Sequence, residues 1–140
     1  MQEIKDTNEL KGCTAEVLAK EAVKILIEKK GLDVRLYNVS GVNSITDFYI
    51  NVTGRSLTHV SSLCDDLVEL LGVRGRDALR VEGKRGISWI LVDYGDVIVN
   101  IFDKSAREFY DFDRHLPEGS LVDIEDCVRA VDDKMKVTED

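Results

Sequence analysis

Two stretches of the chain repeat apolar residues at helical spacing. The first lies between Thr14, which is suited to cap a helix, and Gly31, where glycine permits a left-handed stop. We therefore expect a helix over about residues 15–30, with a buried stripe of Leu18, Ala22, Ile25 and Leu26. The second stretch predicts a helix capped by Ser56 and closed by Gly72, with a stripe of Val60, Leu63, Cys64, Leu67, Leu70 and Leu71.

Shorter apolar or alternating segments predict strands. They cover residues 33–39, 48–52, 79–81, 87–92 and 97–102. Glycine and short polar side chains between them predict turns at residues 40–44 and 83–86 and a hairpin at residues 93–96.

The last third of the chain predicts two further helices. A short one is expected over residues 105–110, after which Pro117 to Gly119 marks the expected end of a domain formed by residues 1–116. Residues 117–140 are expected to form an acidic, helical C-terminal extension. Its apolar residues repeat at helical spacing: Ile124, Cys127, Val128, Val131 and Met135.

This order of elements predicts an α/β fold with a mixed sheet and helices in two layers. Strands 87–92 and 97–102 are apolar on both sides, which is typical of strands covered on both faces. Two long helices can cover only one face. Either the short helix and the tail cover the other, or part of it stays open for a partner or for a homodimer. We expect the tail to fold onto this open face, of its own or a neighbouring chain, and to shield part of a docking surface.

Charge and cysteine use narrow the classes of partner. The 140 residues contain 19 Lys+Arg and 27 Asp+Glu, a net charge of -8. Such a surface repels phosphate groups, so we expect neither DNA nor a membrane as partner, although residues 74–85 are locally basic. The three cysteines lack CxxC spacing, which favours reduced thiols over disulfides or a metal site, and we expect no cofactor. The N-terminal residues do not resemble a signal segment, so we expect a cytoplasmic location.

Candidate catalytic residues are few. Residues 54–56 form a Gly-Arg-Ser turn before a helix, as at the opening of a nucleotidyltransferase site, but the next strand has no Asp-x-Asp for Mg²⁺. A helix N-cap explains the turn better. His59 is expected to be a solvated helix residue and Cys64 a core residue. We therefore expect no enzyme. The alternatives are a nucleotidyltransferase-like enzyme using residues 54–56 with Asp93 and Asp96, or a dimeric adaptor.

Trp89, the single tryptophan, is the strongest candidate contact residue. On an alternating strand it shares a face with Leu91 and Asp93, whereas Tyr94 lies opposite. Trp89 is either a core residue or the apolar anchor of a protein-docking surface. We expect Trp89 to be the apolar anchor of a partner-binding set. Asp93 and Asp96 would accept hydrogen bonds from a partner's Lys or Arg, and Tyr94 would make a mixed apolar and polar contact. Thr46 and Asp47 are secondary candidate contacts.

Five motifs, in order, resemble the ribosomal silencing factor family, also called Iojap-like. They are VSG at 39–41, TDFYI at 46–50, VEG at 81–83, WILVDYGD at 89–96 and AREFYDF at 106–112. The resemblance covers about residues 14–116.

This resemblance implies a fold related to nucleotidyltransferases but without their catalytic carboxylates. It implies a non-enzymatic factor that binds large-subunit ribosomal protein fourteen, hinders joining of the small subunit and lowers translation when nutrients run short. Two departures from the family pattern stand out. Members commonly carry a tryptophan where this chain has residues 113–116, and residues 117–140 are expected to lie outside the pattern.

Overall fold

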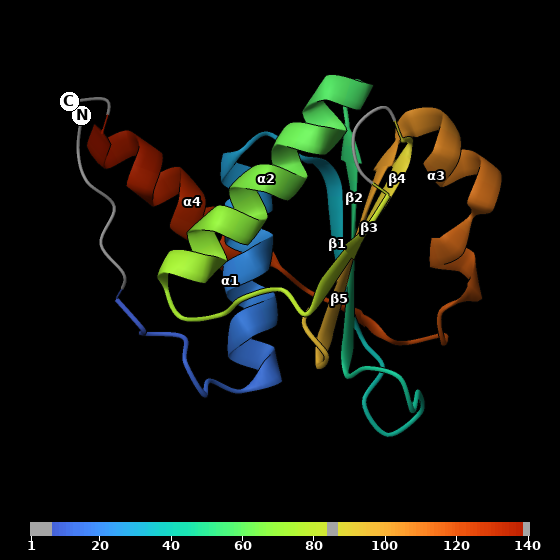
Figure 1. Cartoon of the computed structure of the whole chain (residues 1–140), viewed down its shortest axis with the longest axis horizontal. Helices are drawn as coiled ribbons and strands as arrows, with labels where there is room; N and C mark the ends of the chain where they lie inside the picture. Colours follow the sequence, from blue (N-terminus) through green and yellow to red (C-terminus); the bar gives the residue numbers. More distant parts are fainter. Residues whose placement is uncertain (1–6, 84–86, 139–140) are drawn as a thin grey trace.

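The computed structural model describes residues 7–83 and 87–138 of the chain. Its strands form one sheet in the order β3-β4-β5-β2-β1-β6, with helices on both sides (Figure 1). In chain order the elements are α1 (Ala15–Glu28), β1 (Leu32–Asn38), β2 (Phe48–Gly54), α2 (Leu57–Val73), β3 (Arg80–Glu82), β4 (Trp89–Asp93), β5 (Val97–Asp103), α3 (Lys104–Tyr110), the 3-10 helix η1 (Phe112–His115), β6 (Leu121–Val122) and α4 (Glu125–Thr138).

The sheet is mixed, as predicted. β2 and β5 pair in parallel at its centre, and the other neighbours pair antiparallel. Every residue of β2 is buried, since this strand is covered on both faces. β6 was not predicted, because two residues are too short to show a pattern. The turn expected at residues 83–86 falls almost wholly outside the described residues.

α1 and α2 cover one face of the sheet, as their apolar stripes predict (Figure 1). Thr14 and Ser56 cap them by accepting hydrogen bonds from the Val17 and His59 amides. Cys64 lies in this core, as expected. Fully buried side chains fill the space between helices and sheet: Leu18, Leu26, Leu63, Leu67, Ile50, Ile90 and Ile101.

Two glycines are required by close packing. A Cβ at Gly54 would lie 2.7 Å from Val60 Cγ2, so the Gly-Arg-Ser turn lets α2 begin directly against β2. The hydrogen bond that Ser56 Oγ accepts from the His59 amide confirms the helix N-cap interpretation of the turn. Gly31 does not supply the left-handed stop of α1, because Lys30 does so with a φ of 70°. A Cβ at Gly31 would instead lie 2.6 Å from Val52 Cγ2.

His59 is only partly exposed to solvent, because both of its ring nitrogens are hydrogen-bonded within the chain. Its Nδ1 accepts a hydrogen bond from the Arg55 amide at 2.9 Å, and its Nε2 donates to the Lys29 carbonyl at 3.0 Å. His59 therefore joins the start of α2 to the end of α1.

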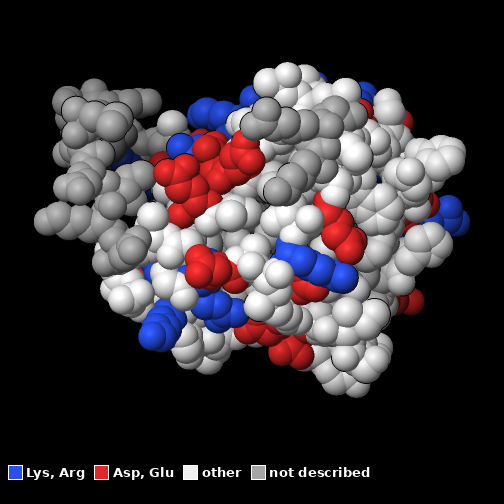
Figure 2. Space-filling model, in the orientation of Figure 1, with Lys and Arg blue, Asp and Glu red and all other residues white. Residues whose placement is uncertain are grey.

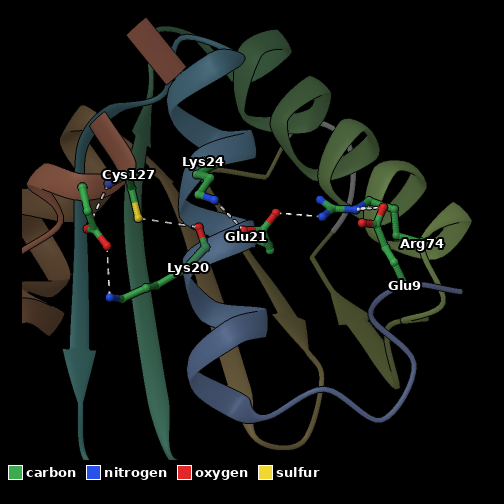
Figure 3. Close-up of polar contacts among 7 residues, drawn as sticks. Glu9, Lys20, Glu21, Lys24, Arg74 and Cys127 are labelled. Carbon is green, nitrogen blue, oxygen red and sulfur yellow. Dashed lines mark hydrogen bonds and ion pairs between the residues drawn. The ribbon is translucent and has the colours of Figure 1, made fainter. Parts of the chain in front are cut away.

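A charged cluster on α1 fixes the helices to each other (Figure 3). The Arg74 guanidinium, at the end of α2, donates to Glu21 at 2.7 Å and to Glu9 at 2.8 Å. Burial opposes the charged form of Glu21, but hydrogen bonds from Lys24 and Arg74 outweigh it and lower the pKa of this carboxyl. The pairing holds the N-terminal segment, α1 and α2 in one arrangement.

The prediction that the tail packs on the open sheet face is wrong. α4 packs against α1, with Cys127 and Val131 buried, and the Cys127 thiol donates to the Lys20 carbonyl at 3.8 Å (Figure 3). Lys20 also pairs with Asp126 at 3.1 Å. Before this helix, β6 pairs with the outer edge of β1. Residues 117–138 therefore complete the sheet and the helix layer, because the apolar stripe of α4 finds its partner on α1.

The face of the sheet opposite α1 and α2 is called here the second face. α3 and η1 lie against it, which adds a partial third layer to the two that were predicted (Figure 1). Tyr37, Val39, Tyr49 and Ile98 form a small apolar cluster there, covered by Phe112 and Leu116. Strands that are apolar on both sides need cover on both faces, and on the second face α3 and η1 provide that cover without α4.

The docking of α4 can be tested at its buried position. Val131→Ala should lower the free energy of unfolding by about 2 kcal/mol, since it removes buried methyl groups and leaves a cavity. Arg129→Ala, on the exposed side of the same helix, should cost less than about 0.5 kcal/mol. Urea unfolding measures both, and equal small costs would show that α4 does not pack on α1.

Candidate partner-binding site

The strand register places Trp89 on the second face. Across β4 and β5, Trp89 lies opposite Phe102, Leu91 opposite Asn100 and Asp93 opposite Ile98. This confirms that Trp89, Leu91 and Asp93 share one face. α3 and η1 cover the middle of that face but leave the β3–β4 end partly exposed.

Aromatic rings form a continuous row from the buried Phe102 to the protein surface. The Trp89 ring centroid lies 5.0 Å from that of Phe102, 6.2 Å from that of Phe112 and 4.8 Å from that of Tyr110. Tyr110 in turn lies 5.1 Å from Phe109. The exposed fraction rises along the row, from 0% at Phe102 to 46% at Tyr110 and 80% at Phe109. We call Trp89, Tyr110 and Phe109 the aromatic patch.

A buried polar line fixes the Trp89 ring from below. The indole Nε1 donates to Asn100 Oδ1 at 3.0 Å, and Asn100 Nδ2 donates to Asn51 Oδ1 at 3.1 Å. Both asparagines are buried at the centre of the sheet, where an unpaired Asn100 or Asn51 side-chain oxygen would be costly, and these bonds satisfy both oxygens. Trp89 is thus partly core and partly surface, and its orientation is set before any partner arrives.

A second polar group clamps α3 and η1 to the sheet. Arg107 donates two hydrogen bonds to Asp113, at 3.1 and 3.0 Å, and reaches Thr53 at 3.0 Å. It also donates to the carbonyl of Asp33 at 2.7 Å, which a bulge in β1 turns toward it. Tyr37 donates its hydroxyl to Asp113 at 2.7 Å.

These bonds shift the pKa of the groups that they join. Burial opposes the charged form of Asp113, but hydrogen bonds from Arg107 and Tyr37 outweigh it and lower the pKa of Asp113. Burial, together with the neighbouring Asp113 carboxylate, raises the pKa of Tyr37 to about 12. The clamp is therefore an ionised carboxylate held between a guanidinium and a neutral phenol.

The predicted carboxylates already have partners within the chain. Asp93 accepts from Arg80 at 3.2 Å and from the Gly95 amide at 2.7 Å. Asp96 pairs with Arg76 at 2.9 Å. The basic stretch that follows α2 thus neutralises the hairpin, and a partner's Lys or Arg would have to compete with Arg76 and Arg80.

Tyr94 does not lie where a surface contact would. It is 4% exposed and packs in the core beneath α2, so burial raises the pKa of its hydroxyl far above the usual range. Thr46 is also buried, whereas Asp47 is exposed. The alternation of β4 had placed Tyr94 opposite Trp89, and the structure follows that pattern.

Sequence reasoning did not select Phe109 and Tyr110 as contact residues. The signal was present, because Phe109, Tyr110 and Phe112 crowd a seven-residue helix and its end, and one short helix cannot bury them all. Residues 7–83 and 87–138 hold no group of three or more His, Cys, Asp or Glu side chains placed to bind a metal ion. Within the same residues, no helix is long and apolar enough to cross a membrane.

The fold and this site define an α/β protein with an exposed aromatic surface that is supported by buried residues of the sheet. Residues 13–140 match the family model described as "Ribosomal silencing factor during starvation". The chain therefore belongs to the ribosomal silencing factor family, RsfS. The match includes residues 117–140, which we had expected to lie outside the family pattern.

Known relatives agree with this assignment. The chain is 39% identical over 85 residues to the ribosomal silencing factor RsfS of Haemophilus influenzae, covering 61% of this chain and 83% of that protein. It is 29% identical over 107 residues to that of Halalkalibacterium halodurans, covering 76% and 92%. A crystal structure of a Chromobacterium violaceum protein superposes with a TM-score of 0.71 at 27% identity, covering 80% of this chain and 96% of that one.

The polar line beneath Trp89 can be tested by removing its central residue. Asn100→Leu should lower the free energy of unfolding by about 2 kcal/mol and shift the Trp89 emission, since it leaves the indole donor and the Asn51 Oδ1 acceptor unpaired. In a Trp89→Phe background the cost should be smaller, because no indole donor is then orphaned. Equal costs in both backgrounds would show that Asn100 does not hold the indole.

The clamp makes a pH-dependent contribution. Because folding lowers the pKa of Asp113, its stabilising effect is complete above the ordinary value of 3.8 and is lost as the pH falls through the lower folded value. Asp113→Asn should therefore lower the free energy of unfolding at pH 7 and flatten its decline in acid. Urea unfolding between pH 2 and 7 measures this. A variant with an unchanged acid profile would rule out the clamp.

Proposed function

We propose that this protein binds the large ribosomal subunit in the cytoplasm through large-subunit ribosomal protein fourteen and blocks joining of the small subunit. Its mechanism is steric occlusion without catalysis, and it represses translation when nutrients are limited. The observation that carries the proposal, beside family membership, is the aromatic patch, with Phe109 80% exposed on a rigid support.

The patch has the composition of a binding hot spot. Aromatic anchors supply most of the free energy of many protein interfaces, and they do so best when they lose little side-chain freedom on binding. Trp89 is held by Asn100, by the buried Phe102 ring and by the partly buried Phe112 ring, so it is already ordered. Phe109 stands furthest out and would enter a pocket on the partner.

Charge would set the approach and orientation. The chain carries a net charge of -8, which favours encounter with a basic ribosomal protein at low salt. Asp93 shares the second face with Trp89, and its partner Arg80 is exposed at the edge. In this proposal a basic side chain of the partner replaces Arg80 on Asp93, while Asp96 stays paired with Arg76.

The proposal includes a fold related to nucleotidyltransferases without their catalytic carboxylates. The parallel strands β2 and β5 end at Gly54 and Asp103. Gly54 serves close packing, and Asp103 caps α3 by accepting from the Ala106 amide at 2.8 Å. The carboxylates named for the enzymatic alternative, Asp93 and Asp96, are paired with arginines.

Phe109→Ala tests the patch without disturbing its core. It should weaken binding to purified large subunits by about 2 kcal/mol, roughly thirtyfold, with little change in the free energy of unfolding, because the ring is exposed. Val17→Ala on α1, also exposed, is the matched control. Sucrose-gradient sedimentation measures binding, and addition of small subunits measures joining.

Two results would overturn this proposal. One is failure of the unmodified protein to sediment with large subunits at low salt. The other is undiminished binding by a folded Phe109→Ala variant. Light scattering of the free protein reports whether a homodimer occupies the patch, in which case Phe109→Ala would dissociate the dimer as well.

A further inference from the structure

A second surface lies on the opposite side of the sheet from the aromatic patch. Here a groove of about 350 Å³ runs between α2 and the strand β3. Val81 lies opposite Val92, a core residue beneath the helices, so this part of β3 faces α2. The floor of the groove is apolar, formed by Cys64, Val68, Val81 and Ile90.

One wall of the groove is acidic. Asp65 and Glu69 lie four residues apart on α2, so they project from successive turns above the apolar floor. Figure 2 shows acidic side chains gathered over this helix. In residues 7–83 and 87–138, no ion pair joins either carboxylate to a basic side chain. Within the part of the chain that the structure describes, both carboxylates are therefore available to a basic ligand.

The other side of the groove is the edge of the sheet. β3 is the outermost strand, with β4 as its single neighbour among the described residues. An edge strand leaves a row of backbone amides and carbonyls to which another extended segment can pair. Leu79, just before β3, is 72% exposed, so the approach to this edge is open.

We propose that β3 and this groove bind an extended basic peptide segment of a protein partner, which adds to the sheet as a further strand. Its alternate side chains enter the groove. The stem of an arginine or lysine lies on Val68 and Val81, and its charged end meets Asp65 or Glu69. Acidic walls repel phosphate groups, so nucleic acid does not fit here. This inference does not rest on the proposed ribosomal function.

A labelled heptapeptide of alternating threonine and arginine, TRTRTRT, is the probe. Fluorescence anisotropy should show binding to the full chain at low salt. The variant Asp65→Asn with Glu69→Gln should bind about tenfold more weakly, since two charge pairs are lost. The matched control, Asp132→Asn with Asp133→Asn on α4, removes the same charge elsewhere and should bind as the unmodified protein does.

Two further peptides separate strand addition from plain charge attraction. The block peptide RRRTTTT has the same composition but cannot place its arginines on one side of a strand. A TRTRTRT peptide methylated on alternate amides loses the donors of one strand edge. Strand addition predicts weak binding of the block peptide and of one of the two methylation patterns.

The outcomes are decisive in each direction. The proposal would be overturned if the unmodified protein bound all of these peptides with equal affinity, or if it did not bind TRTRTRT at low salt. It would also be overturned if the variant with changes at Asp65 and Glu69 bound TRTRTRT as tightly as the control variant with changes at Asp132 and Asp133. Phe109→Ala should leave TRTRTRT binding unchanged. Loss of ribosome binding in that variant and loss of peptide binding in the α2 variant are therefore independent results.

Discussion

The aromatic patch depends on how α3 and η1 are held against the second face of the sheet. Arg107, in α3, reaches Asp113 in η1, the bulged carbonyl of Asp33 in β1 and the hydroxyl of Thr53 in β2. One guanidinium thus joins two helical segments to two strands. Because the guanidinium is largely buried and carries the charge that pairs with Asp113, its removal would leave Asp113 mostly buried without a countercharge. The position of Tyr110 and Phe109 relative to Trp89 follows from this clamp.

The two faces of the sheet serve different purposes. α1, α2 and α4 bury one face, and paired charges on α1 lock these helices together. The second face is covered only in part, and its exposed margin carries aromatic rings that are ordered from behind. The helix layer and the proposed ribosome-binding patch therefore lie on opposite sides of β2 and β5. Because Phe109 lies outside the helix layer, we expect its replacement to leave that layer intact.

Much of this fold could be predicted from periodicity, because α1, α2, α4 and five strands carry clear apolar patterns. The site was harder to predict. The alternation of β4 correctly placed Trp89 on the same face as Asp93 and on the opposite face from Tyr94. The pairing of Asp93 and Asp96 with Arg80 and Arg76, however, depends on which strands become neighbours. The prediction for the tail failed for the same reason. The apolar stripe of α4 indicates that this helix packs against another element, but it does not indicate that the other element is α1.

The central claim is that the aromatic patch is the surface that meets the large ribosomal subunit. Hydrogen–deuterium exchange of the full chain, with and without purified large subunits, tests it most directly. The account predicts slower amide exchange in residues 104–112 and in β4 when subunits are present, with α1 and α4 unchanged. Protection confined to α1 and α4, with residues 104–112 unaffected in a bound protein, would contradict it.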